Sequence, residues 1–209
     1  MEKKFVITIN RKCGSGGGTV GRRVAELLGV RFYDKALIDL SEEPEERRDM
    51  LRRADDRIKN AVFSRVSKGE FDGVLVAPDS PDRAAHDELF CCQAQAIHQL
   101  AEQESCVVVG RCADYILRDL PHTVNLFFTA DEPDCIRNEC RRLDIPKKQA
   151  QDRIRKVNAH RRAYYTYHTG AEWDDPQRYD MVIDTTDKSF DECAAIIIDY
   201  ISGLQYEED

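Results

Sequence analysis

The sequence lacks long apolar segments and has no excess of basic residues. Its longest apolar runs, such as 107–109 and 196–198, cover only a few residues, whereas a helix that crosses a bilayer needs about 20. Acidic residues outnumber Lys and Arg by 39 to 31, which gives a net charge of −8. A protein of that sign has little general affinity for nucleic acid or anionic lipid. We therefore expect no nucleic-acid or membrane partner and, without a signal-peptide pattern after Met1, a cytoplasmic location.

The sequence also lacks the closely paired cysteines of a structural zinc site. Its eight cysteines stand at positions 13, 91, 92, 106, 112, 135, 140 and 193, and none of them forms a C-x-x-C pair. Cysteines of this kind act mostly as small buried hydrophobic side chains when the compartment keeps them reduced. We expect that role here, and only the adjacent Cys91 and Cys92 leave a redox role open.

Short apolar runs alternate with helical patterns along the whole chain. We expect strands at 5–9, 30–33, 106–109, 123–128 and 181–184, and helices at 19–28, 42–69, 82–104, 113–118, 134–165 (broken near Pro146) and 190–201. Apolar strands that alternate with helices are typical of a parallel sheet with both faces covered. The sequence thus predicts one α/β domain over 1–209, with a helical insertion at 42–104 and a basic, lid-like segment at 134–170.

Glycines are concentrated between the first expected strand and the first expected helix. Five of the eight residues from 14 to 21 are glycine, more than a turn requires. Glycines let successive backbone N–H groups point into one concavity, and the N-terminus of the following helix adds a favourable field for anions. The segment is therefore predicted to bind phosphate.

Two phosphate-binding motifs compete for this loop. Residues 16–21 fit the dinucleotide motif G-x-G-x-x-G, and Asp34 lies where a ribose-binding acid would be expected. On the P-loop template, Arg11 takes the first glycine position, Gly16 the last, and Gly17 the lysine position. The dinucleotide motif begins almost at the end of its strand, whereas several residues intervene here. The loop length favours a P-loop, although the missing lysine argues against an ordinary one.

Basic residues gather in the segment 137–162, although the chain as a whole is acidic. That segment holds ten Lys and Arg residues against three acidic ones. The planar guanidinium of arginine binds phosphate oxygens with two hydrogen bonds and stays charged. A solvated helical face with i,i+4 ion pairs is the alternative, above all for Lys147, Lys148 and Arg153. The segment is predicted to bind small polyanions.

Three segments in this order resemble one known family. They read GSGGGTVGRRVAELLGVRFYDKALI from residue 14, VVVGRCADYIL from residue 107 and RRAYYTYHTG from residue 161. Together they look like the cytidylate kinase-like family, relatives of the bacterial cytidylate kinases within the nucleoside monophosphate kinases. The resemblance implies a three-layer α/β/α P-loop fold with an Arg-rich helical lid. It also implies ATP and Mg²⁺ as cofactors and a nucleoside monophosphate, preferably CMP or dCMP, as phosphoryl acceptor.

The resemblance further implies roles for individual residues. The phosphate loop would consist of Gly14, Ser15, Gly16, Gly17, Gly18 and Thr19. Thr19 is the candidate Mg²⁺ ligand, with helix capping as the alternative role of its hydroxyl. The acceptor would contact Asp34, Arg111, Arg142, Lys156 and Asn158. The catalytic cations would be Arg137, Arg141 and Arg161. Lys12 is added to them as a candidate replacement for the lysine that the loop lacks, and not through the resemblance. Cytidylate kinases carry Asp where this chain has Cys112 and Asn158, so the acceptor base stays open.

Gly17 leaves the loop without the lysine that stabilises the transition state in ordinary P-loop kinases. Lys12, Arg11 or Lys156 could supply the missing charge. A phosphate acceptor is already ionised at neutral pH, so no general base is required. Two alternatives remain open: a nucleotide- or phosphometabolite-binding protein without turnover, and a kinase for another small phosphate acceptor.

Aromatic residues cluster beside the lid-like segment. Trp173, Tyr164, Tyr165 and Tyr167 are expected to pack in the core, with base stacking as the alternative. The histidines at 98 and 160 show no partner spacing, and the sequence assigns them no role.

Overall fold

A computed structural model describes residues 4–34 and 43–204. Within these residues, five strands form one sheet in which every neighbouring pair is parallel, in the order β2-β3-β1-β4-β5. The strands are β1 (Val6–Arg11), β2 (Arg31–Tyr33), β3 (Cys106–Val109), β4 (Thr123–Thr129) and β5 (Met181–Asp184). Because all strands run the same way, their carboxyl ends meet at one edge of the sheet, where ligands of open α/β sheets bind.

The central strand β1 pairs with β3 on one side and with β4 on the other, so that Ile9 lies between Val109 and Leu126. These three side chains are almost fully buried. Strands buried on both faces need apolar residues at nearly every position, which explains the continuous apolar runs of the sequence.

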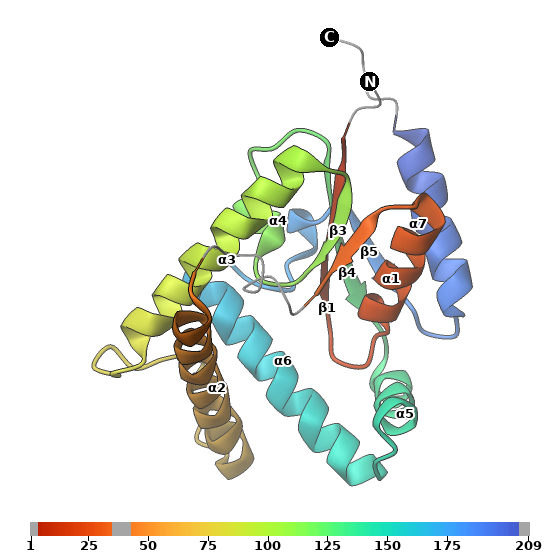
Figure 1. The fold of residues 1–209 in the computed structure, drawn as a ribbon. Helices are drawn as coiled ribbons and strands as arrows, with labels where there is room; N and C mark the ends of the chain where they lie inside the picture. Colours follow the sequence, from red (N-terminus) through yellow and green to blue (C-terminus); the bar gives the residue numbers. More distant parts are fainter. Residues whose placement is uncertain (1–3, 35–42, 205–209) are drawn as a thin grey trace.

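Helices cover both faces of the sheet (Figure 1). One face packs against α1 (Gly17–Leu28) and α7 (Phe190–Gly203), which also contact each other. The other face packs against α3 (Arg83–Gln103) and the short α4 (Ala113–Ile116). The fold is therefore the predicted three-layer α/β/α arrangement with a parallel sheet.

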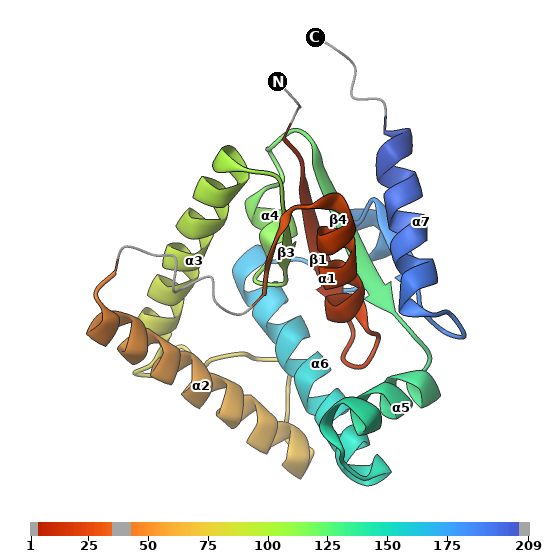
Figure 2. The ribbon, with the colours of Figure 1, turned by 45° about the vertical axis from the view of Figure 1, so that its right-hand side comes forward.

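Three helices project beyond the carboxyl edge of the sheet, as Figures 1 and 2 show. They are α2 (Glu45–Lys68), α5 (Glu132–Leu143) and α6 (Lys147–Thr169). The break predicted near Pro146 is confirmed, since Pro146 caps the N-terminus of α6. The short helix η2 (Pro176–Arg178) then leads into β5. Residue 42, where the sequence places the start of a helix, lies outside the described residues.

The predicted core position is confirmed for three of the four aromatic residues, whereas Tyr167 is only partly buried against them. Trp173, Tyr164 and Tyr165 are buried together with Phe127 of β4. Six cysteines are likewise buried, at positions 13, 92, 106, 112, 135 and 193, whereas Cys91 is exposed. Among the described residues, none of the helices is long and apolar enough to span a bilayer.

Candidate active site

Two adjoining cavities open at the carboxyl edge of the sheet. The first has a volume of about 430 Å³ and lies on the glycine loop, beneath α5 and α6. The second has a volume of about 350 Å³ and lies between α2, α6 and the turn after β3. Four residues line both cavities, namely Arg11, Asp34, Arg153 and Arg161. A ligand in one cavity therefore shares a wall with a ligand in the other.

The glycine loop connects β1 to α1 and is held in place from two sides. Gly14 has φ 86°, and a Cβ on it would overlap the backbone of Cys135 in α5, so only glycine fits. Its carbonyl accepts a hydrogen bond from Asn138 Nδ2 at 2.8 Å. On the other side, Thr185 Oγ1 donates to the Ser15 carbonyl at 2.9 Å. These contacts fix the loop between α5 and the end of β5.

Helix α6 is attached directly to the same loop. Asn158 Oδ1 accepts a hydrogen bond from the Cys13 backbone N–H at 2.7 Å. Arg161 Nη1 donates to the Arg11 carbonyl at 2.9 Å. Two side chains one helical turn apart thus bind the loop backbone and set the position of α6 above it.

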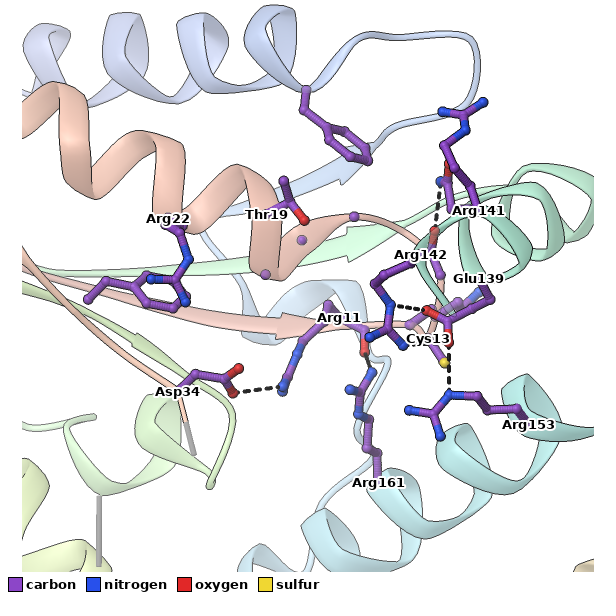
Figure 3. Close-up of a pocket in the computed structure, with 18 residues that line it drawn as sticks. Arg11, Cys13, Thr19, Arg22, Asp34, Glu139, Arg141, Arg142, Arg153 and Arg161 are labelled. Carbon is purple, nitrogen blue, oxygen red and sulfur yellow. Dashed lines mark hydrogen bonds and ion pairs between the residues drawn. The ribbon is translucent and has the colours of Figure 1, made fainter. Parts of the chain in front are cut away.

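The wall shared by the cavities carries a concentration of positive charge (Figure 3). The Arg11 guanidinium lies 3.4 Å from the Asp34 carboxylate, and its side chain is only 16% exposed. Burial lowers the pKa of Arg11 to about 9, and the nearby charge of Arg161 acts in the same direction. Burial also lowers the pKa of Arg161. Two partly buried guanidiniums near a single carboxylate favour the binding of an anion.

One buried carboxylate joins α5 to α6 at the first cavity. Glu139 accepts hydrogen bonds from Arg142 Nη2 at 2.7 Å and from Arg153 Nε at 2.9 Å, as Figure 3 shows. Burial acts to raise the pKa of Glu139, but the hydrogen bonds from both arginines outweigh it and lower that pKa. The carboxylate therefore stays ionised and holds two cations against the cavity.

In the second cavity, an arginine and a carboxylate lie among aromatic side chains. Arg111 Nη1 lies 3.5 Å from Asp55 Oδ2, and Asp55 Oδ1 lies 3.3 Å from Nδ1 of the buried His86. Burial acts to raise the pKa of Asp55, but His86 and the charge of Arg111 outweigh it and lower that pKa to about 2. Asp55 is thus ionised at neutral pH and holds the Arg111 guanidinium at the cavity, beside the ring of Tyr164.

A sequence profile described as the cytidylate kinase-like family matches residues 6–187. This range contains the glycine loop, α5, α6 and every residue that lines the two cavities except Phe190. The chain belongs to the cytidylate kinase-like family. No functionally curated protein sequence matches it.

Solved structures share the fold of this cytidylate kinase-like protein. An uncharacterized protein from Eubacterium ventriosum aligns over 96% of this chain and 99% of its own, with 24% identity and a TM-score of 0.70. A gluconokinase from Sinorhizobium meliloti aligns over 97% and 95%, with 16% identity and a TM-score of 0.51. A shikimate kinase from Acinetobacter baumannii, in complex with shikimate, aligns over 99% and 97%, with 14% identity and a TM-score of 0.50. The fold is that of the P-loop kinases.

Most residues that the sequence singled out in this kinase-like protein lie at the two cavities. The first cavity is lined by Lys12, Gly14, Gly16, Gly17, Gly18, Thr19, Arg141 and Arg142. Asp34 and Arg161 line both cavities, and Arg111 lines the second. Ser15 is fully buried beneath the loop, where its hydroxyl donates to the Lys12 carbonyl at 2.9 Å.

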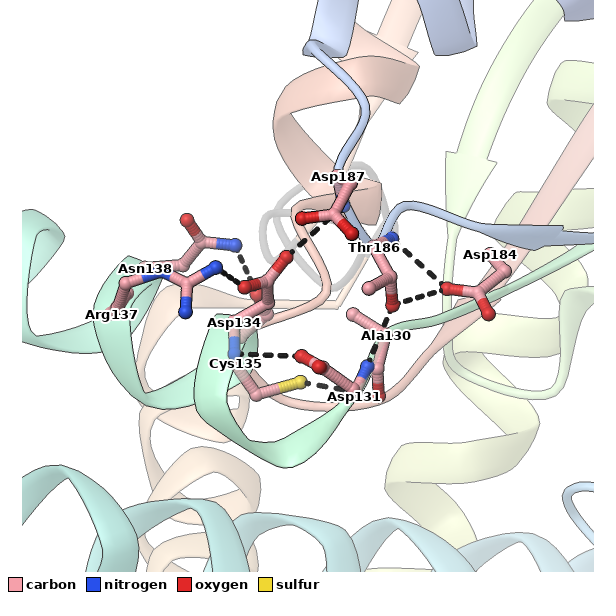
Figure 4. A network of polar contacts seen from close by, with 10 residues as sticks. Ala130, Asp131, Asp134, Cys135, Arg137, Asn138, Asp184, Thr186 and Asp187 are labelled. Atoms are coloured by element: carbon pink, nitrogen blue, oxygen red, sulfur yellow. Dashed lines mark hydrogen bonds and ion pairs between the residues drawn. The ribbon is translucent and has the colours of Figure 1, made fainter.

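Three predicted residues lie elsewhere: Arg137, Lys156 and Asn158 are not among the side chains that line these cavities. Arg137 pairs with Asp134, which also accepts the Asp187 backbone N–H in a network between α5 and the loop after β5 (Figure 4). Asn158 binds the glycine loop. The catalytic role of Arg137 and the acceptor roles of Lys156 and Asn158 stay predictions, which these positions do not support.

Asp55 and His160 both line the second cavity, although no motif in the sequence predicts a role for either. Asp55 could have been found from the sequence, because it lies with Ala54 and Ile58 on the apolar, buried side of α2. A charged side chain in that position needs a partner and is therefore a candidate site residue. For His160 the sequence offers no such indication, although its ring contacts Phe63 of α2 and Tyr164 of its own helix. Its pKa is lowered to about 4, chiefly by burial, so it is a neutral imidazole in the cavity wall at neutral pH.

Proposed function

We propose that the protein transfers a phosphoryl group from ATP to a nucleoside monophosphate, with CMP or dCMP as the preferred acceptor. The observation that carries this proposal is the wall that the two cavities share, which is lined by Arg11, Arg153, Arg161 and Asp34. Phosphoryl transfer requires donor and acceptor in line and positive charge at the point where they meet. Two adjoining cavities with cations at their boundary meet both requirements.

The first cavity suits the triphosphate of ATP. It combines the backbone N–H groups of the glycine loop, the N-terminus of α1 and the side chains of Lys12, Arg141 and Arg142. Thr19 lies in the first turn of α1 and lines this cavity, so its hydroxyl is available to Mg²⁺. Within residues 4–34 and 43–204, no group of three His, Cys, Asp or Glu side chains could hold a metal ion. Mg²⁺ would therefore be held mainly by the nucleotide's phosphates and water, as is usual for this ion.

The second cavity suits the acceptor. Arg111 would bind the acceptor phosphate, and Asp55 keeps its guanidinium in place. Phe63 lines the same cavity and is only partly buried, so its ring offers apolar surface to a base. The acceptor phosphate is ionised at neutral pH, so Asp34 remains paired with Arg11 and is not needed as a base.

A coupled assay for ADP release tests the proposal, with CMP, dCMP, UMP, AMP and GMP as acceptors. We expect turnover to be fastest with CMP or dCMP. In Arg111→Gln, loss of a charged contact should raise the KM for the acceptor about 10- to 100-fold, while the affinity for ATP stays unchanged.

Three other outcomes would contradict part or all of the proposal. Turnover with another nucleotide alone would overturn the CMP preference and leave the nucleoside monophosphate kinase in place. Turnover only with a hydroxyl acceptor such as shikimate would show that the acceptor is not a nucleoside monophosphate, although the protein would still be a kinase. Tight ATP binding without turnover on any acceptor would overturn the proposal that the protein is a kinase. It would favour a nucleotide-binding protein without catalytic activity.

A further inference from the structure

The lysine position of the loop has no room for a side chain. A Cβ on Gly17 would lie 2.8 Å from Cγ of Phe128 and 2.9 Å from Cβ of Arg11. Phe128 is fully buried in β4 and cannot move aside without opening the core. The space that a loop lysine would need is therefore filled partly by the side chain of Arg11.

Arg11 runs from the end of β1 through a passage that two glycines leave open. Its Cβ lies against Gly17, and its guanidinium lies against Gly110 at the end of β3, where a Cβ would be 2.5 Å from Nη1 of Arg11. Any larger residue at either position would displace the arginine. The passage leads to the boundary between the cavities, both of which Arg11 lines.

Within residues 4–34 and 43–204, the surroundings of Arg11 disfavour its charge, although Asp34 is close enough to act as a counter-ion. Burial and the charges of Arg161 and Arg111 lower its pKa to about 9, against the opposing effect of Asp34 and a smaller one of Cys13. The guanidinium is still protonated at neutral pH. A phosphoryl group at the boundary would relieve the repulsion among these arginines, so the cluster is suited to a polyanion.

We propose that Arg11 is the catalytic cation of this protein and takes over the task of the missing loop lysine from the first position of the loop. This inference rests on the proposed function. During transfer, an oxygen of the acceptor phosphate bonds to the γ-phosphorus while the bond to the β,γ-bridging oxygen breaks and its electron pair leaves with ADP. Arg11 keeps its proton throughout and stabilises the moving group through charge and hydrogen bonds.

The two other candidate cations are less well placed. Lys12 lines the first cavity but not the second, so it can reach the phosphoryl donor but not the acceptor. Lys156 is not among the residues that line either cavity. Of the three, Arg11 alone faces both the donor and the acceptor.

The test compares Arg11→Gln with the unmodified protein in two measurements. Loss of the charge should lower kcat about 100- to 1,000-fold. It should also weaken ATP binding about tenfold more than ADP binding, because only ATP extends a phosphate to the boundary. Arg23→Gln, which removes an exposed charge of α1 that pairs with Asp191, serves as the control and should change neither value.

Arg11→Lys keeps the charge on a shorter side chain, so it should retain the preference for ATP over ADP and a lowered but measurable kcat. This variant keeps the inference testable if Arg11→Gln fails to fold. In folded Arg11→Gln, a wild-type kcat and an unchanged ATP-to-ADP ratio would overturn the role of Arg11 and leave the proposed function intact. In folded Arg11→Lys, loss of the preference for ATP despite the retained charge would overturn it in the same way. Absence of turnover in the unmodified protein would overturn both.

Discussion

The side-chain oxygen of Asn158 accepts a hydrogen bond from the backbone N–H of Cys13 at 2.7 Å. The two residues are 145 positions apart in the sequence. Asn158 lies in the middle of α6, the helix that contributes Arg153 and Arg161 to both cavities. The contact therefore sets the distance between the phosphate loop and the cations that face it.

Substitution of Asn158 should separate this positioning role from a role in acceptor binding. Asn158→Ala leaves the Cys13 N–H without its partner and should lower the free energy of unfolding by about 1–2 kcal/mol. Asn158→Asp keeps an acceptor for the hydrogen bond but adds a negative charge near the phosphate loop. It should retain stability and weaken ATP binding several-fold. Urea unfolding and ATP titration measure the two effects, and an altered acceptor KM with unchanged ATP affinity would contradict them.

Two adjacent loop glycines should respond in opposite ways to the same substitution. Gly17→Ala places a methyl group against Phe128 and Arg11 and should cost about 1–3 kcal/mol through overpacking. A Cβ on Gly18 meets no atom within 4 Å, so Gly18→Ala should be neutral or stabilise α1 by about 0.5–1 kcal/mol. Thermal unfolding of the two variants measures the difference. Equal destabilisation by both would show that the contacts at Gly17 with Phe128 and Arg11 do not determine the effect.

Neutralising Glu139 should change stability and ligand affinity in opposite directions. Glu139→Gln weakens the hydrogen bonds that Glu139 accepts from Arg142 and Arg153. We expect the free energy of unfolding to fall by only about 1–2 kcal/mol, because both arginines are half exposed and their charges are screened by solvent. The same change removes a negative charge from the first cavity, so ATP should bind several-fold more tightly. Glu132→Gln, at an exposed position of the same helix, is the control. Weaker ATP binding in Glu139→Gln would contradict the prediction.

Buried histidines should make the protein sensitive to mild acid. Burial lowers the pKa of His160 to about 4 and that of His168 to about 3, whereas both titrate near pH 6.5 in an unfolded chain. Between pH 6.5 and about 4 the unfolded chain therefore binds more protons, and stability falls as the pH falls. Each histidine should lower the free energy of unfolding by roughly 1 kcal/mol per pH unit in this window.

Replacement of one histidine tests this origin of the acid sensitivity. His168→Gln should reduce the slope of the unfolding free energy against pH by the contribution of about one bound proton. The control is His98→Gln, on an exposed surface of α3, which should leave this slope unchanged. Slopes are compared rather than absolute stabilities, because His168 also stacks on Phe90 at 3.9 Å. An unchanged slope in His168→Gln would assign the acid sensitivity to other groups.

Local sequence patterns predicted the elements of this fold closely. Each expected strand is present in the sheet, and the break at Pro146 separates α5 from α6. These features follow from apolar periodicity, glycine and proline, which act over a few residues. The one shift at the loop, where α1 begins at Gly17 rather than at residue 19, lies within the usual uncertainty of helix ends.

The sequence by itself determined that a glycine loop follows the first strand and that cations accumulate in a later helical segment, since both properties lie within short stretches of chain. Only the tertiary structure decided which cations face a ligand. Arg11 reaches the shared wall because Gly17, Gly110 and Phe128, from α1, the end of β3 and β4, shape its passage. Asn158 turns to the loop through a contact that no local pattern records. Side-chain direction at such a site is set by packing between distant segments, which sequence spacing does not specify.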